Sequence, residues 1–297
     1  MLSPTCAAIA RLCENALPVT FEPAQMYPIA ALACYLASGL LLLRRQLAGS
    51  VDTPVAGAAP ALLLGAAGLA VHTLTLRGLV GVGGGPELSL GGVLSLVGWL
   101  LALFALLGAA RPRFRGLAAV VLPVAGLAAV AALAPDPSTP RAEPLDWTIH
   151  AHVVLSILAY SLLSLGAALA VLFLLRDRTL RRRQPFAWTR ILPPLESLED
   201  ALFTAIFAGF SVLTLAVFSG LIFVEDIFAQ HLVHKSALSI VAWCVFAVLL
   251  LGRWRLAWRG RQAVHWALAG YGLLALAYFG SRFVLEFILG RQWGLGA

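Results

Sequence analysis

A long apolar stretch at residues 147–175 is the feature that most constrains this chain. Its 29 residues contain no Asp, Glu, Lys or Arg, and about 20 apolar residues are enough for a helix to cross a bilayer. Arginines follow at once, at positions 176, 178, 181, 182 and 183. Because positive charge collects in cytoplasmic loops, this pattern predicts a transmembrane helix that begins at the outer face and ends in the cytoplasm.

The composition of the whole chain also favours a membrane protein. Hydrophobic residues make up 61% of it and charged residues 12%, which is about half the charged share of soluble domains. Further apolar stretches predict spans at 26–43, 55–76, 88–110, 116–134, 201–224, 236–252 and 264–289. We therefore expect an all-α integral membrane protein, a bundle of about eight transmembrane helices. The expected organisation is a non-spanning segment at 1–25, four helices within 26–134 and four within 135–297.

The distribution of arginine predicts the orientation of the bundle. If alternate loops are cytoplasmic, fifteen of the 21 Lys and Arg residues lie inside, and both termini then face the outer, periplasmic side. The fifteen are Arg44, Arg45, Arg111, Arg113, Arg115, Arg176, Arg178, Arg181, Arg182, Arg183, Arg190, Arg253, Arg255, Arg259 and Arg261. The net charge of +7 thus arises from short loops beside a lipid bilayer, and we expect no nucleic-acid partner.

Polar side chains recur at every fourth residue of the 147–175 stretch, at Thr148, His152, Ser156, Tyr160 and Ser164. Residues four apart share one face of a helix, so this spacing predicts a polar stripe directed into the bundle. His150 lies roughly 200° from His152 around the helix axis, and we expect only His152 to face inward. Two interpretations stay open for His152, a ligand or a histidine tolerated near the lipid headgroups.

Four of the six histidines gather at the predicted outer face. They are His150, His152, His231 and His234. Residues 225–235 form a predicted outer loop that can present His231 or His234 towards His152. Two imidazoles from different helices can hold a haem iron between them. Zinc is the competing metal, but no cysteine or carboxylate set completes a recognisable zinc pattern.

The last predicted span carries Tyr278, Arg282 and Glu286, which are four residues apart and share a face. Arg282 can pair with Glu286 one turn away, or it can bind an anionic group such as a haem propionate, and both interpretations stay open. His72, in the outer half of its span, and His265, near the cytoplasmic start of the last span, receive no assigned role.

Glycines in the first three predicted spans indicate close helix packing rather than a cofactor motif. They are Gly39, Gly65, Gly68, Gly91, Gly92 and Gly98.

Four segments of the chain resemble the cytochrome c assembly protein family. They are HVVLSILAYSLL at 152–163, PPLESLED at 193–200, HKSALSIVAWCVFAVLLLGRWRLAWRGRQAVHW at 234–266 and LAYFGSRFVLEFIL at 276–289. The pattern is most similar to the bacterial inner-membrane YpjD/HemX-like branch, which is related to the haem handlers CcsA and CcmC. The resemblance covers about residues 147–289, and the first four helices are much less distinctive.

The resemblance implies a multi-pass protein of the bacterial inner membrane that binds haem b at the outer face. His152 and His234 are then the expected iron ligands, Arg282 is expected at the haem, and other cytochrome c maturation proteins are possible partners. One departure matters, because members that present haem for attachment to cytochrome c carry a tryptophan-rich WGxxWxWD loop. This chain has VEDIFAQHLVHK at 224–235 instead. The resemblance therefore supports haem binding or a regulatory assembly role rather than direct delivery.

Haem handling without catalytic activity is thus the expected function. One competing class is a transporter, or an accessory to one, that uses the outer histidines as proton or metal sites, although paired interrupted helices are not evident. A purely structural membrane partner is the third class. Neither competing class predicts a haem absorption spectrum.

Overall fold

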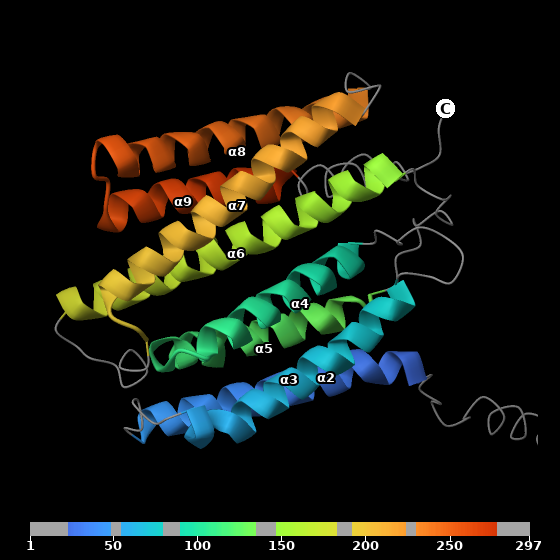
Figure 1. Cartoon of the computed structure of the whole chain (residues 1–297), viewed down its shortest axis with the longest axis vertical. Helices are drawn as coiled ribbons and strands as arrows, with labels where there is room; N and C mark the ends of the chain where they lie inside the picture. The colour runs from blue at the N-terminus through green and yellow to red at the C-terminus, as the bar shows by residue number, and fades with distance from the viewer. Residues whose placement is uncertain are drawn as a thin grey trace, which may run out of the picture.

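The computed structural model describes residues 23–48, 55–79, 90–134, 147–182, 192–223 and 230–277. Within these residues the chain is helical, with no strand (Figure 1). The helices are α2 (Pro23–Leu47), α3 (Val55–Leu79), α4 (Leu90–Ala109), the short 3-10 helix η1 (Pro112–Phe114), α5 (Arg115–Ala131), α6 (Trp147–Arg181), α7 (Leu195–Phe223), α8 (Gln230–Arg255) and α9 (Gly260–Ala275). The predicted all-α architecture is confirmed.

Among the described residues, seven candidate spans are long and apolar enough to cross a bilayer, and the chain is a multi-pass membrane protein. The longest of them runs from Trp147 to Arg181, 35 residues, which corresponds to the stretch that dominates the sequence. Helix α9 has 16 residues in the described part of the chain. The predicted eighth span, 264–289, continues past Ala277 and so lies partly outside the described residues, and the total of eight stays a prediction.

Successive helices alternate in direction, so the bundle has two distinct ends (Figure 1). Arginines occupy the last turns of α2, α6 and α8, which finish together at the left of Figure 1. We call this the arginine end. Helix α6 begins at the opposite end, which carries His152 in its second turn and is called the His152 end.

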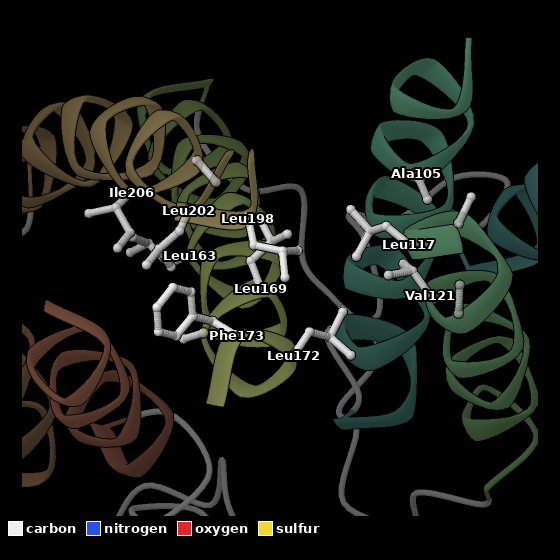
Figure 2. Close-up of a cluster of buried hydrophobic side chains, with 14 of the residues drawn as sticks. Ala105, Leu117, Val121, Leu163, Leu169, Leu172, Phe173, Leu198, Leu202 and Ile206 are labelled. Atoms are coloured by element: carbon white, nitrogen blue, oxygen red, sulfur yellow. The ribbon is translucent and has the colours of Figure 1, made fainter. Parts of the chain in front are cut away.

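The helices pack as two groups, α2 to α5 and α6 to α9, joined by contact between α4 and α6. Figure 2 shows leucine and isoleucine side chains of α6 and α7 meeting in a continuous layer, with Leu163 of α6 beside Leu202 and Ile206 of α7. Leu172 lies on the side of α6 nearer to α4 and α5. Helix α6 therefore contributes to both halves of the hydrophobic core, which fixes the position of its polar residues.

Small residues let the N-terminal helices approach closely, as their glycines predict. A Cβ atom at Gly68 would lie 3.0 Å from the ring of Tyr35, and one at Gly98 would lie 2.5 Å from the Cβ of Ala128. Side chains at these positions would force α2 from α3 and α4 from α5.

Ion pairs hold the C-terminal helices together at the arginine end. Arg253 of α8 donates to Glu199 of α7 at 2.8 Å, and the second Glu199 oxygen accepts the Gly260 N–H at 3.1 Å. Asp177 of α6 pairs with Arg181 at 3.0 Å and with Arg261 of α9 at 3.8 Å. Helices α6 to α9 are therefore tied at one end by charge, which leaves the His152 end to be positioned by other contacts.

Candidate functional site

His152 lies where α6 and α7 meet. Its Nδ1 is 3.0 Å from the hydroxyl oxygen of Ser219, which lies near the end of α7. The imidazole is partly buried by this contact. The predicted inward direction of His152 is thus confirmed.

On α7, which the His152 ring contacts, Gly220 directly follows Ser219. A Cβ atom at Gly220 would lie 2.9 Å from Cε1 of His152, closer than real Cβ contacts allow. The ring therefore packs against bare backbone at this point. Two consecutive residues of α7, Ser219 and Gly220, set the position of the His152 ring.

The second ring nitrogen of His152 has no hydrogen-bond partner among the described residues. The Nδ1 contact to Ser219 is the ring's one hydrogen bond within that part of the chain. A neutral imidazole with one nitrogen hydrogen-bonded and the other free is the usual form of a histidine metal ligand. The donor chemistry at His152 therefore fits a haem iron.

Further along α6, the predicted polar stripe turns from α7 to α9. Tyr160 donates a hydrogen bond to the Leu274 carbonyl at 2.9 Å, and the hydroxyls of Ser164 and Tyr271 lie 2.8 Å apart. The stripe therefore faces the interior along at least three turns, and it attaches α6 to both of its neighbours in the C-terminal half.

The predicted loop at 225–235 is partly wrong, because helix α8 already begins at Gln230. Residues 230–235 contain neither glycine nor proline, and nothing in them stops the helix that the following apolar residues form. His231 and His234 thus lie on the first turns of α8. Since α8 starts only seven positions after α7 ends at Phe223, these turns lie at the His152 end.

The side chains of His150, His231, His234 and Arg282 lie outside the described residues. The proposed pairing of His152 with His234, and the role of Arg282, therefore stay predictions. His265 is exposed near the start of α9, at the arginine end, as its position in the sequence predicts.

A buried polar cluster around His72, in the N-terminal half, was not predicted. His72 of α3 is completely buried; its Nδ1 lies 3.3 Å from the Tyr35 hydroxyl of α2 and its Nε2 lies 2.9 Å from the Ser95 hydroxyl of α4. The only sequence signal was a set of polar residues within apolar spans. Both nitrogens of His72 are occupied, so this ring joins three helices and offers no atom to a ligand.

Other metal chemistry finds no support in the described part of the chain. No three His, Cys, Asp or Glu residues come together there in a way that could hold a metal ion. Cys34 and Cys244 are free thiols.

Comparison with known proteins agrees with this architecture. The model of the Cytochrome C assembly protein family matches residues 87–289, more than half of the chain. The chain belongs to this family. The match begins before α4 and therefore includes α4 and α5, which precede the region of resemblance quoted from the sequence.

Several relatives share this region. Inner membrane protein YpjD of Escherichia coli (strain K12) is 38% identical over 137 residues, 46% of this chain and 52% of YpjD, so the chain spans about half the length of that relative. An uncharacterized 28.8 kDa protein of Azospirillum brasilense is 30% identical over 272 residues, 89% of this chain and 98% of that protein. Cytochrome c biogenesis protein CcsA of Synechococcus elongatus is 24% identical, covering 73% of this chain and 83% of CcsA. No solved structure matches the chain.

Proposed function

We propose that this protein handles haem during cytochrome c biogenesis in the bacterial inner membrane, and that it binds haem b at the His152 end. Membership of the cytochrome c assembly family supports a role in cytochrome c biogenesis, and the name of the relative YpjD supports the inner membrane. The observation that carries the haem assignment is the geometry of His152. Its ring is held through Nδ1, and Nε2 has no hydrogen-bond partner among the described residues.

A second histidine that would hold the haem iron is proposed to come from α8. His231 and His234 are three residues apart, so they point roughly 60° from each other around the helix. Positions three apart lie on the same side of a helix, so either residue can supply the ligand from one side of α8. His234 is the preferred ligand and His231 the alternative, and either would supply a second imidazole to the haem iron.

Arg282 is proposed to bind a propionate of the same haem. Helix α9 runs from the arginine end towards the His152 end (Figure 1), and Arg282 follows Ala277 by five positions in the sequence. A guanidinium pairs with a carboxylate through two parallel hydrogen bonds. When bound, the haem would supply the redox-active iron, while the chain's own residues bind and orient it.

An absorption spectrum of the purified wild-type protein tests this proposal. The expected result is a Soret band and the pyridine haemochrome of b-type haem, either as isolated or after haem is added to detergent-solubilised protein. His152→Ala is the matched variant, since it removes only the partly buried ring. The proposal fails if wild-type protein binds no haem, or if His152→Ala binds it as tightly as wild type with the same spectrum.

A further inference from the structure

We propose that Ser219 is a positioning residue that fixes the tautomer of His152, so that Nδ1 carries the ring proton and Nε2 carries the lone pair. The inference rests on the proposed function only where it concerns iron. The tautomer itself is a property of the chain without haem.

The hydroxyl of Ser219 determines which group donates the hydrogen bond between Ser219 and His152. Ser219 has a single O–H hydrogen, and its oxygen lies 2.9 Å from the carbonyl oxygen of Ala216, to which it donates. A carbonyl oxygen can only accept, so the hydroxyl proton of Ser219 lies in the bond to Ala216. Towards His152 Nδ1, at 3.0 Å, the same oxygen must therefore accept, and the imidazole must be the donor.

The opposite tautomer makes one hydrogen bond fewer. If Ser219 donated to an unprotonated Nδ1, its bond to Ala216 would be lost, and the Nε2–H would have no acceptor among the described residues. One net hydrogen bond favours the Nδ1–H tautomer by roughly 2- to 12-fold. An iron ligand needs this form, because the binding nitrogen must have a free lone pair.

The surrounding helix keeps this arrangement in place. Ala216 is buried and Gly220 lies against the His152 ring, so neither the serine nor the ring can move far without separating α6 from α7. The two helices also approach closely at Gly166, where an added Cβ atom would lie 3.1 Å from the side chain of Ile206. Ser219 therefore lies at a closely packed contact between α6 and α7.

Nuclear magnetic resonance of haem-free protein labelled with ¹⁵N-histidine tests the tautomer directly. At alkaline pH, where imidazoles are neutral, the two ring nitrogens of each tautomer have well-separated shifts, and His152→Ala identifies the signals of His152. Wild type and Ser219→Thr should show mostly protonated Nδ1, whereas Ser219→Ala should show a lower Nδ1–H fraction. Ser211→Ala is the matched control, since exposed Ser211 makes the same kind of bond, to Phe207 O at 2.8 Å, two turns earlier.

Haem titration gives the second readout. Loss of the group hydrogen-bonded to a metal-binding histidine usually weakens metal binding about 10- to 100-fold. The haem affinity of Ser219→Ala should therefore fall by that factor, whereas the haem affinities of Ser219→Thr and Ser211→Ala should stay near wild type. A dominant Nε2–H signal in wild type, or an unchanged tautomer in Ser219→Ala, would overturn the inference. Absence of haem binding in wild type would overturn the proposed function instead, and the shifts would still decide the role of Ser219.

Discussion

Two histidines lie towards the same end of this bundle, and their surroundings differ in one respect. His72 is completely buried and uses both ring nitrogens to join α2, α3 and α4. His152 is partly buried, and in the described part of the chain only its Nδ1 is hydrogen-bonded, to Ser219 of α7. The location of a histidine within a membrane span therefore does not by itself make that histidine a ligand. The number of ring nitrogens that the fold leaves free separates the structural residue from the candidate ligand.

The two halves of the bundle also differ in the contacts that hold their helices together. In the N-terminal half, glycines and small side chains bring the helices together around a closed polar cluster. In the C-terminal half, charge holds the arginine end together and hydroxyls direct the α6 stripe to two neighbours. The first half is therefore expected to respond to mutation through stability, and the His152 end of the second half through ligand binding.

The largest expected difference is all-or-none and concerns the side of the membrane on which both histidines lie. With the four native cysteines replaced by serine, Gln230→Cys should react with an impermeant maleimide in intact spheroplasts, whereas Thr179→Cys should react only after permeabilisation. The reason is the arginine excess at the opposite end. If only Thr179→Cys were labelled from outside, the orientation of the bundle would be the opposite of the predicted one.

Next in size is the stability effect of His72→Ala. The substitution leaves a cavity and removes two interhelical hydrogen bonds, so the free energy of unfolding should fall by about 2–4 kcal/mol. Haem bound per folded molecule should not change. Thermal unfolding in detergent, followed by tryptophan fluorescence, measures the first quantity and haem titration the second, with exposed His265→Ala as the control. Lost haem binding at unchanged stability would place His72 in the binding site.

A pair of glycines on α7 offers a more selective comparison. In Gly220→Ala the new Cβ atom would lie 2.9 Å from His152 Cε1, and in Gly209→Ala it would lie 2.8 Å from Leu163 Cδ2. The first change should displace the ligand and weaken haem binding about tenfold. The second should cost about 1–3 kcal/mol of stability through overpacking with haem affinity retained. If the two variants lost haem affinity equally, general helix separation would explain both.

The smallest expected effect is that of Tyr35→Phe. It removes one hydroxyl from the closed cluster, whose distance to His72 Nδ1 is 3.3 Å, and a hydrogen bond within a membrane bundle averages about 0.6 kcal/mol. Unfolding measurements should detect a loss of that size, well below the effect of His72→Ala. Tyr27→Phe, at an exposed position near the start of α2, provides the baseline. A loss as large as that of His72→Ala would mean that the cluster acts as one unit.

Much of the architecture could be predicted from the sequence, because long apolar stretches and arginine runs act through length and charge alone. The inward direction of His152 also followed from the four-residue spacing of the α6 stripe. What the spacing could not supply was the partner. Whether α7 meets α6 at Ser219 or one turn away depends on how the glycines and leucines of both helices interlock, and no periodicity within one helix records that register.

The His72 cluster was missed for a related reason. Tyr35, His72 and Ser95 are far apart in the sequence, and each alone is an ordinary polar residue in an apolar span. Only their packing in three dimensions makes them one cluster. The start of α8 was misjudged differently, because the histidines and lysine at 231–235 suggested a loop although all of them tolerate a helix.

The most direct test of the central claim is reduced-minus-oxidised difference spectroscopy on single alanine variants of His150, His152, His231 and His234, with protein amount checked by blot. If His152 and His234 hold one iron from opposite sides, His152→Ala and His234→Ala should change the spectrum alike, towards five-coordinate or weakly bound haem. His150→Ala should change the spectrum much less. A large effect of His231→Ala, with little effect of His234→Ala, would identify His231 as the α8 ligand. An unchanged six-coordinate spectrum in both His152→Ala and His234→Ala would contradict the account.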